Sequence, residues 1–209
     1  MMLKKIALAV ALSAASTVSF AGTFDGFFGQ AGIGMADTAL RINVSGDPGF
    51  SVKLGDDSFI GQVALGYSYA WGAFNLAGSA YYDIGDQKAG MISGTSSTLG
   101  SGSIDFKGKN VWGISIDPGM YVNDTTLLYV KIGYQDAKFE ANGQQIGGTK
   151  TFDGITYGLG VKYTFAPHWY GTLEIQQAAY QGKSETSEGS TADFKPETRT
   201  TLFSVGYTF

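Results

Sequence analysis

The only histidine of the chain is the first residue to consider, because a Ser-His-Asp triad or a His-based metal cluster would have to include it. His168 follows Ala166-Pro167 and precedes Trp169, and this short run is typical of a turn. We therefore interpret His168 as a turn residue rather than as a catalytic base or a metal ligand. The chain has no cysteine, which excludes a thiol nucleophile and a disulfide. We predict that the protein is not an enzyme.

Two acidic groups could bind a hard cation, because calcium and magnesium prefer clustered oxygen ligands. They are Asp56-Asp57 and the pair Glu185 and Glu188. Neither has the spacing of an EF-hand or of a glycine-aspartate repeat, so solvated loop charge is the favoured interpretation. No metal and no cofactor are predicted.

The first 21 residues have the pattern of a secretory signal. Lys4 and Lys5 are followed by an apolar stretch at 6–15 and by Ser19-Phe20-Ala21, a small-residue cleavage pattern. That stretch is shorter than the ~20 residues that a membrane-spanning helix needs. We expect cleavage after Ala21 and a single domain over 22–209.

Composition narrows the class of the remaining domain. Without Lys4 and Lys5 it has 12 basic and 18 acidic residues, so nucleic acid is not an expected partner. Glycine makes up 31 of 209 residues, about twice its usual share of about 7%, while charged residues are only 15%. After the signal no apolar run approaches 18 residues, so a membrane location requires strands. Lipid offers no partner to backbone groups, and only a closed barrel satisfies them all.

The domain divides into segments in which apolar and small or polar residues alternate, as in β-strands. Each is near the ~9–11 residues that cross a bilayer at a tilt. The eight predicted strands are 24–36, 58–69, 74–85, 110–122, 126–136, 155–165, 170–180 and 198–209. We predict an all-β, eight-stranded antiparallel up-and-down transmembrane barrel.

Charge indicates which face of the sheet points outward, since a soluble lipocalin-like barrel would also alternate. Eight charged residues fall in the predicted strands, namely Asp25, Asp83, Asp117, Lys131, Asp136, Lys162, Glu174 and Arg199. Five of them lie on the polar face, whereas a water-facing outer wall would be rich in Lys and Glu. The apolar face is therefore predicted to contact lipid, and the polar face to fill the lumen. Within this pattern, Pro118 falls at a lipid-facing position of its strand, and a proline at that position predicts a bulge.

The connections alternate between short and long, as in outer-membrane barrels. Short connections fall at about 70–73, 123–125 and 166–169, and four long ones at about 37–57, 86–109, 137–154 and 181–197. Several aromatic residues flank the short turns, where an interfacial girdle belongs. We expect periplasmic turns, and four extracellular loops that could bind an external ligand.

Four charged residues of the polar face are predicted to form ion pairs in the lumen. Opposed residues of an antiparallel hairpin have a constant sum of positions, so a turn centred on 124 places Asp117 opposite Lys131. A turn centred on 168 places Lys162 opposite Glu174. Two pairs at one depth would plug the barrel. The alternative is a register slipped by two residues, in which case the charges only line a wet lumen.

The segments GISIDPGMYVNDTTLLYVKIGY (113–134) and YGLGVKY (157–163), with the final strand, resemble the outer-membrane β-barrel family that includes OmpX and opacity-type proteins. Phe203, Val205, Tyr207 and Phe209 share one face of that last strand, which is similar to the signal read by the barrel-assembly machinery. The resemblance implies an outer-membrane location, contact with lipid and lipopolysaccharide, and roles from surface adhesion to envelope integrity. It does not imply one activity.

We therefore expect a non-enzymatic outer-membrane barrel with a lumen plugged by side chains, because eight strands leave an interior just wide enough for side chains to fill. A narrow porin or a conduit for small hydrophobic molecules is the first alternative. An enzyme acting on lipid A or on peptides is the second, and the single, unfavourably placed histidine argues against it.

Overall fold

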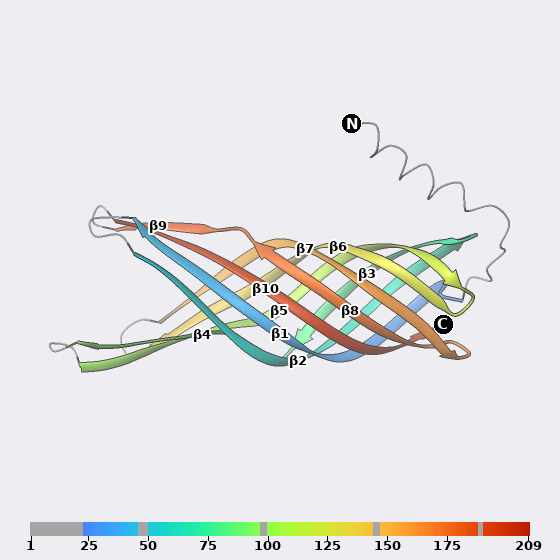
Figure 1. Cartoon of the computed structure of the whole chain (residues 1–209), viewed down its shortest axis with the longest axis horizontal. Helices are drawn as coiled ribbons and strands as arrows, with labels where there is room; N and C mark the ends of the chain where they lie inside the picture. The colour runs from blue at the N-terminus through green and yellow to red at the C-terminus, as the bar shows by residue number, and fades with distance from the viewer. Residues whose placement is uncertain (1–22, 46–49, 97–99, 144–146, 188–189) are drawn as a thin grey trace, which may run out of the picture.

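The computed structural model describes residues 23–45, 50–96, 100–143, 147–187 and 190–209, which form ten strands and no helix (Figure 1). The strands wind into one long cylinder with hairpins that extend from one end (Figure 1). Their bounds are β1 Gly26–Ser45, β2 Phe50–Trp71, β3 Phe74–Ile84, β4 Gln87–Ser96, β5 Gly100–Asn123, β6 Thr126–Gly143, β7 Gly147–Ala166, β8 Trp169–Tyr180, β9 Lys183–Ser187 and β10 Ser190–Thr208. The described residues contain no helix long and apolar enough to span a membrane.

Eight of the strands close the barrel. Each pairs antiparallel with its neighbour in the order β1-β2-β3-β5-β6-β7-β8-β10, and β10 returns to β1 with Ile33 opposite Phe203. The short strands β4 and β9 follow β3 and β8 in the chain and pair with β5 and β10. The prediction of an eight-stranded antiparallel up-and-down barrel is confirmed. Closure leaves no free edge along the cylinder wall, as a membrane requires.

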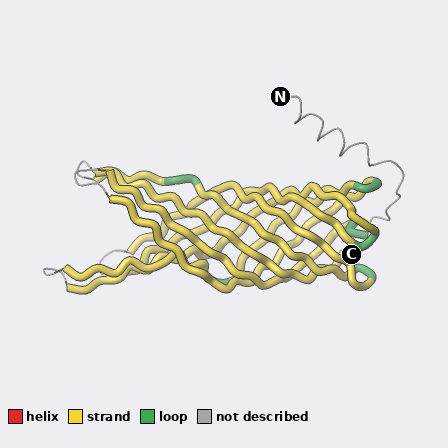
Figure 2. The backbone as a smooth tube through the Cα atoms, in the orientation of Figure 1, coloured by secondary structure: helices red, strands yellow, loops and turns green. Residues whose placement is uncertain are grey.

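Three turns of two residues lie at the end of the cylinder that also holds Phe209, which we call the turn end (Figure 2). They occupy 72–73, 124–125 and 167–168, and the predicted short connections are confirmed. Gly72 has φ +58° and His168 has φ +67°, which is the left-handed conformation that a tight hairpin turn requires. His168 is thus a turn residue, as its neighbours in the sequence indicated.

The opposite end, here called the hairpin end, differs from the prediction of four loops. Most of the residues expected in loops continue the ladders of the barrel as paired strands (Figure 2). The β1–β2 ladder, for example, continues outward to the pair of Val44 and Phe50. The predicted strand bounds were wrong because each strand was ended where the apolar face ended, whereas backbone hydrogen bonds can continue a hairpin beyond the apolar belt.

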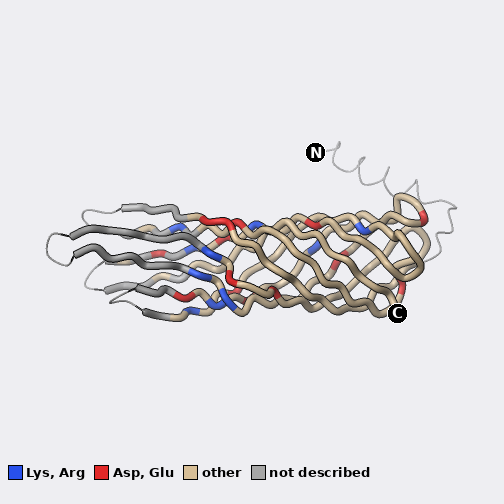
Figure 3. The backbone as a smooth tube through the Cα atoms, turned by 90° about the horizontal axis from the view of Figure 1, so that it is seen from below, with Lys and Arg blue, Asp and Glu red and all other residues tan. Residues whose placement is uncertain are grey.

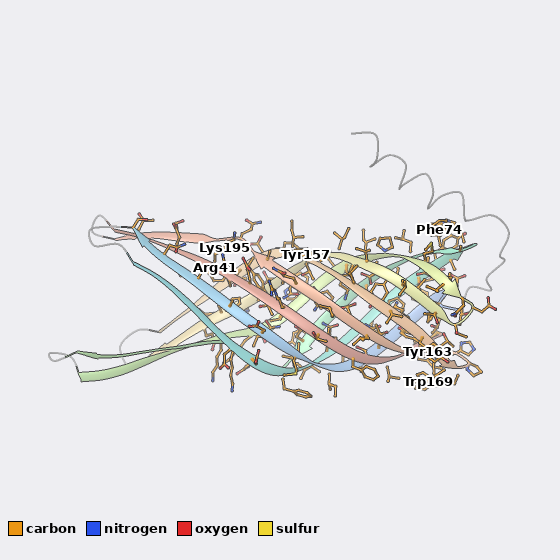
Figure 4. All side chains as sticks on the ribbon, viewed as in Figure 1. Arg41, Phe74, Tyr157, Tyr163, Trp169 and Lys195 are labelled. Carbon is orange, nitrogen blue, oxygen red and sulfur yellow. The ribbon has the colours of Figure 1, made fainter. Side chains whose placement is uncertain are left out.

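The two faces of the wall have the predicted directions. Phe59 and Leu65 on β2 are 70% and 71% exposed on the outside, while Gln62 and Ser68 between them are buried. Tyr157, Tyr163 and Trp169 project from the outer wall in the same way (Figure 4). Lysine, arginine, aspartate and glutamate gather mostly where the cylinder passes into the hairpins (Figure 3). The outside of the cylinder is therefore an apolar belt of the kind that contacts lipid.

Pro118 does not form the predicted bulge. It pairs with Leu76 on the β3 side, and the β5–β6 register is the same at Ile116 and at Gly119, on either side of it. The irregularities of β5 fall elsewhere, between Lys109 and Trp112 and after Tyr121. A proline that lacks its N–H is accommodated here by a local gap in the ladder. The predicted cleavage after Ala21 lies outside the described residues and stays a prediction.

Candidate functional site

The interior of the barrel is the candidate site, because the buried polar and charged side chains gather there. All four residues of the predicted ion pairs point inward and are at most 5% exposed, namely Asp117, Lys131, Lys162 and Glu174. They lie between an aromatic layer at the turn end and a hydrogen-bonded layer toward the hairpins.

An aromatic plug closes the turn end. Phe24, which precedes β1, packs between Tyr121 and Tyr170 with ring centroids 5.9 and 5.6 Å away. Two neighbours hold this segment in place, because Thr23 Oγ1 donates to the carbonyl of Asp124 at 2.8 Å and Asp25 Oδ1 accepts from the Ala70 N–H at 3.3 Å. The buried cluster is completed by Phe28, Ala77 and Leu127. The short segment before the first strand thus folds across the mouth of the lumen.

An ion pair lies at the centre of the lumen. Lys131 Nζ on β6 donates to Glu174 Oε1 on β8 at 2.7 Å, and Tyr129 Oη donates to Glu174 Oε2 at 2.6 Å. Both oxygens of the carboxylate are therefore engaged in charge-assisted hydrogen bonds. The Lys131 ammonium also lies 5.1 Å from the centroid of the Tyr81 ring. This one carboxylate therefore joins β6 to β8.

The predicted pairing of Lys162 with Glu174 is wrong. Lys162 lies opposite Thr172, and Glu174 lies opposite Gly160, so the β7–β8 register differs by two residues from the predicted one. A register shift beside the turn, between Thr164 and Ala166, contributes to this offset. Slippage by two residues was the alternative that the sequence left open.

Lys162 is instead surrounded by aromatic rings. Its Nζ lies 4.7 Å from the ring centroid of Phe28 and 5.3 and 5.5 Å from those of Tyr129 and Tyr170, within the range of a cation–π interaction. Asp117 is buried on the lumen face of β5, and its Oδ1 has no hydrogen-bond partner among the described residues. No ion pair within 4.0 Å joins Asp117 to Lys131 in the part of the chain that the structure describes.

Aromatic rings of the lumen lie over glycines of the neighbouring strand. Four such pairs are directly opposed, namely Phe28 with Gly66, Tyr81 with Gly113, Tyr129 with Gly160 and Tyr170 with Gly206. A Cβ at any of these glycines would lie 2.2–2.5 Å from the ring. Much of the unusual glycine content of the inner face is therefore space for aromatic side chains. The sequence showed the glycines but not which ring covers each one.

The layer nearer the hairpins is a network of amides and hydroxyls. Gln62 Nε2 and Gln87 Nε2 donate to the two oxygens of Asp83 at 2.8 and 2.9 Å. Gln135 Nε2 donates to Tyr180 Oη at 2.5 Å and accepts from Tyr81. Phe139 packs edge-on against Phe152 and Tyr180 at 5.5 Å. Sequence reasoning placed Gln62, Asp83 and Gln135 in strands but missed the network, because Gln87, Phe139 and Phe152 fall in 86–109 and 137–154, which were assigned to loops.

The residues considered for catalysis or for metal binding do not come together in the structure. His168 Nδ1 is hydrogen-bonded to the Thr208 carbonyl oxygen at 2.8 Å, and its ring stacks on Tyr207 at the turn end. Asp56 and Asp57 lie exposed on β2, whereas Glu185 lies on β9 and Glu188 outside the described residues. Among the described residues, no group of three or more His, Asp or Glu side chains could hold a metal ion.

The predicted assembly residues form an outward row at the turn end of β10. Phe203, Val205 and Phe209 are exposed on the outer wall, and the Tyr207 ring packs edge-on against Phe209 and Trp169. Their recognition by the barrel-assembly machinery stays a prediction.

The model of one family, the outer membrane protein beta-barrel domain, matches residues 6–209. The chain belongs to this family. Membership in the outer membrane protein beta-barrel domain family indicates the bacterial outer membrane as its location. A comparison with curated protein sequences gives no significant match.

Solved structures with a similar fold include three outer-membrane barrels. The outer membrane protease OmpT from Escherichia coli is 12% identical, with a TM-score of 0.51 over 93% of this chain and 100% of that one. Neisserial surface protein A is 16% identical, with a TM-score of 0.45 over 88% and 98%. Ail, the attachment invasion locus protein of Yersinia pestis, is 15% identical, with a TM-score of 0.43 over 87% and 99%. At these identities the similarity is one of fold.

Proposed function

We propose that the protein is a closed, non-catalytic outer-membrane barrel that acts through its hairpins, as a surface interaction protein or as a support of the envelope. The filled lumen carries this proposal. Side chains occupy it from the plug around Phe24, through the pair of Lys131 and Glu174, to the network around Asp83. A solute would have to displace buried hydrogen-bonded groups at each of these layers.

The alternative of a narrow pore or hydrophobic conduit is supported by the glycine-rich inner face. In this structure, however, four of those glycines lie directly beneath aromatic rings, and the space they leave is occupied. A proteolytic role, suggested by the protease OmpT, would need a general base, most often a histidine, near an attacking nucleophile or water. The imidazole of His168 instead contacts Thr208 and Tyr207 at the periplasmic turn.

The purified barrel is expected to give no steady conductance in planar lipid bilayers, because the plug and the central ion pair both block the lumen. Replacing Phe24 and Tyr121 together by alanine removes two of the four aromatic rings of the plug but leaves the layer of Lys131 and Glu174, so this variant should also stay closed. Stable, ohmic current steps from the wild-type protein would contradict the proposal and favour the porin alternative.

The hairpins are expected to face the outside of the cell. The chain has no cysteine, so a single introduced thiol reports its own position. Lys195→Cys, at an exposed site on the extended part of β10, should react with a membrane-impermeant maleimide on intact cells. The control Asp124→Cys, at an exposed turn-end position, should react only after the outer membrane is permeabilised. Labelling of Asp124→Cys alone on intact cells would reverse the proposed orientation.

A further inference from the structure

Four lysines gather on the outward faces of β4, β5 and β6, just beyond the apolar belt. Lys109 lies directly opposite Lys138, and Lys107 lies directly opposite Lys88. All four are at least partly exposed. We call these residues the lysine quartet. Charged residues gather around the cylinder where the hairpins begin (Figure 3).

Directly opposed like charges on neighbouring strands destabilise a sheet, so two such pairs side by side require an explanation. Glu140 compensates part of the charge, since its carboxylate binds Lys109 Nζ at 2.8 Å and lies opposite Lys107. The hydrogen bond that Lys109 donates to the Glu140 carboxylate raises the pKa of Lys109 above its usual value, with a smaller contribution from the negative charge of Asp86. Lys88, Lys107 and Lys138 have no carboxylate within 4.0 Å among the described side chains.

The level of the quartet relative to the membrane follows from the residues beneath it. Trp112 lies opposite Tyr82 and contacts Tyr134 edge-on at 6.5 Å, and all three rings are exposed on the outer wall. Such an aromatic ledge marks the boundary between acyl chains and headgroups. Lys138 lies four residues beyond Tyr134 along β6, which is about 13 Å along a tilted strand. The lysines are therefore at headgroup level and point sideways toward lipid.

One acidic pair lies between the ledge and the lysines. Asp136 is directly opposite Asp153 on the same outward face. These carboxylates repel an anion at their own level, while Lys138, two residues further out along β6, attracts it. The order of aromatic, acidic and basic residues thus selects the depth at which an anionic group can lie against the wall.

We propose that the lysine quartet binds the phosphate groups of the glycolipid of the outer leaflet, of the lipid A type. The proposal rests on the proposed orientation, with the hairpins outside, and adds a partner to it. A lipid phosphate fits better than a free anion or a protein, because the quartet faces the plane of the bilayer directly above the aromatic ledge. Binding would neutralise the two opposed lysine pairs and tie the barrel to the headgroup layer.

Native mass spectrometry of the full-length barrel in detergent tests this proposal with diphosphoryl lipid A as the probe. At about 1 kcal/mol for each lysine near an anionic surface, the variant K107Q/K138Q should bind about 30-fold more weakly than wild type. The matched control R41Q/K195Q removes an exposed, directly opposed basic pair on β1 and β10 (Figure 4). It should lose less than about 3-fold, since it lacks the aromatic ledge.

Several outcomes would overturn the proposal. Equal losses in the two variants would show attraction by overall charge alone, and equal binding of lipid A from which both phosphates have been removed would show that phosphate is not what is recognised. Displacement by millimolar inorganic phosphate would assign the quartet to a free anion instead of a lipid. Folding is checked by heat-modified mobility on gels. Because binding in detergent does not depend on orientation, failure here with correct labelling of Lys195→Cys would leave the proposed function standing.

Discussion

Replacing Glu174 by alanine is expected to destabilise the barrel by roughly 3–5 kcal/mol, since it leaves a buried charge without its partner. Lys131 is 2% exposed, and Glu174 is the carboxylate that it contacts. Tyr129 loses the acceptor of its hydrogen bond in the same change. Urea unfolding of the barrel in lipid vesicles, followed by tryptophan fluorescence, measures the difference in the free energy of unfolding.

The double variant Lys131→Met and Glu174→Leu is the control for this prediction. Apolar residues of similar size remove both charges together, so much of the lost stability should return. The change Lys162→Met provides a second comparison, because Lys162 contacts aromatic rings and no carboxylate within 4.0 Å among the described residues. If the effects of the single changes Lys131→Met and Glu174→Leu add up strictly in the double variant, the ion pair does not couple the two strands.

The sequence placed Asp117, Lys131, Lys162 and Glu174 in the lumen. The β5–β6 pairs on either side of Asp117 have the predicted register, but the ion pair that forms joins Lys131 to Glu174, and β7 shows why. Lys131 lies opposite Gly158 and Glu174 lies opposite Gly160, so two glycines of β7 lie between the strands that carry the pair. Without side chains there, the long side chains of β6 and β8 meet across β7. Hairpin arithmetic considers only adjacent strands and cannot predict a contact that spans three.

The lengths of the strands were underestimated for a different reason. The predicted strand 24–36 stops where outward apolar residues stop, yet β1 continues to Ser45. The alternation in the sequence also continues, with Leu40, Ile42 and Val44 separated by Arg41 and Asn43. A transmembrane criterion based on bilayer thickness gives the extent of the lipid-facing wall and not the extent of the ladder. The number of strands, their direction and the side of each strand that points to lipid could be predicted, because period-two patterning decides them.

The pairing of aromatic rings with glycines predicts a change in stability opposite to the one that strand propensity alone would give. Valine is a better strand former than glycine, so Gly160→Val would stabilise an ordinary strand by up to about 1 kcal/mol. Here a Cβ at Gly160 would lie 2.2 Å from Cζ of Tyr129, a ring that is held by its hydrogen bond to Glu174. The ring must move, and we expect a net loss of about 3 kcal/mol from overpacking together with the weakened hydrogen bond.

Gly171→Val is the matched control, because no atom lies within 4 Å of a Cβ built at Gly171 on the neighbouring strand β8. There the added side chain meets open space on the lipid-facing parity of the strand, so the same substitution should be neutral or stabilising. Urea unfolding in lipid vesicles compares the two variants with wild type. Equal stability of Gly160→Val and Gly171→Val would mean that Tyr129 does not depend on the glycine beneath it, and that the central ion pair of the lumen is not held from that side.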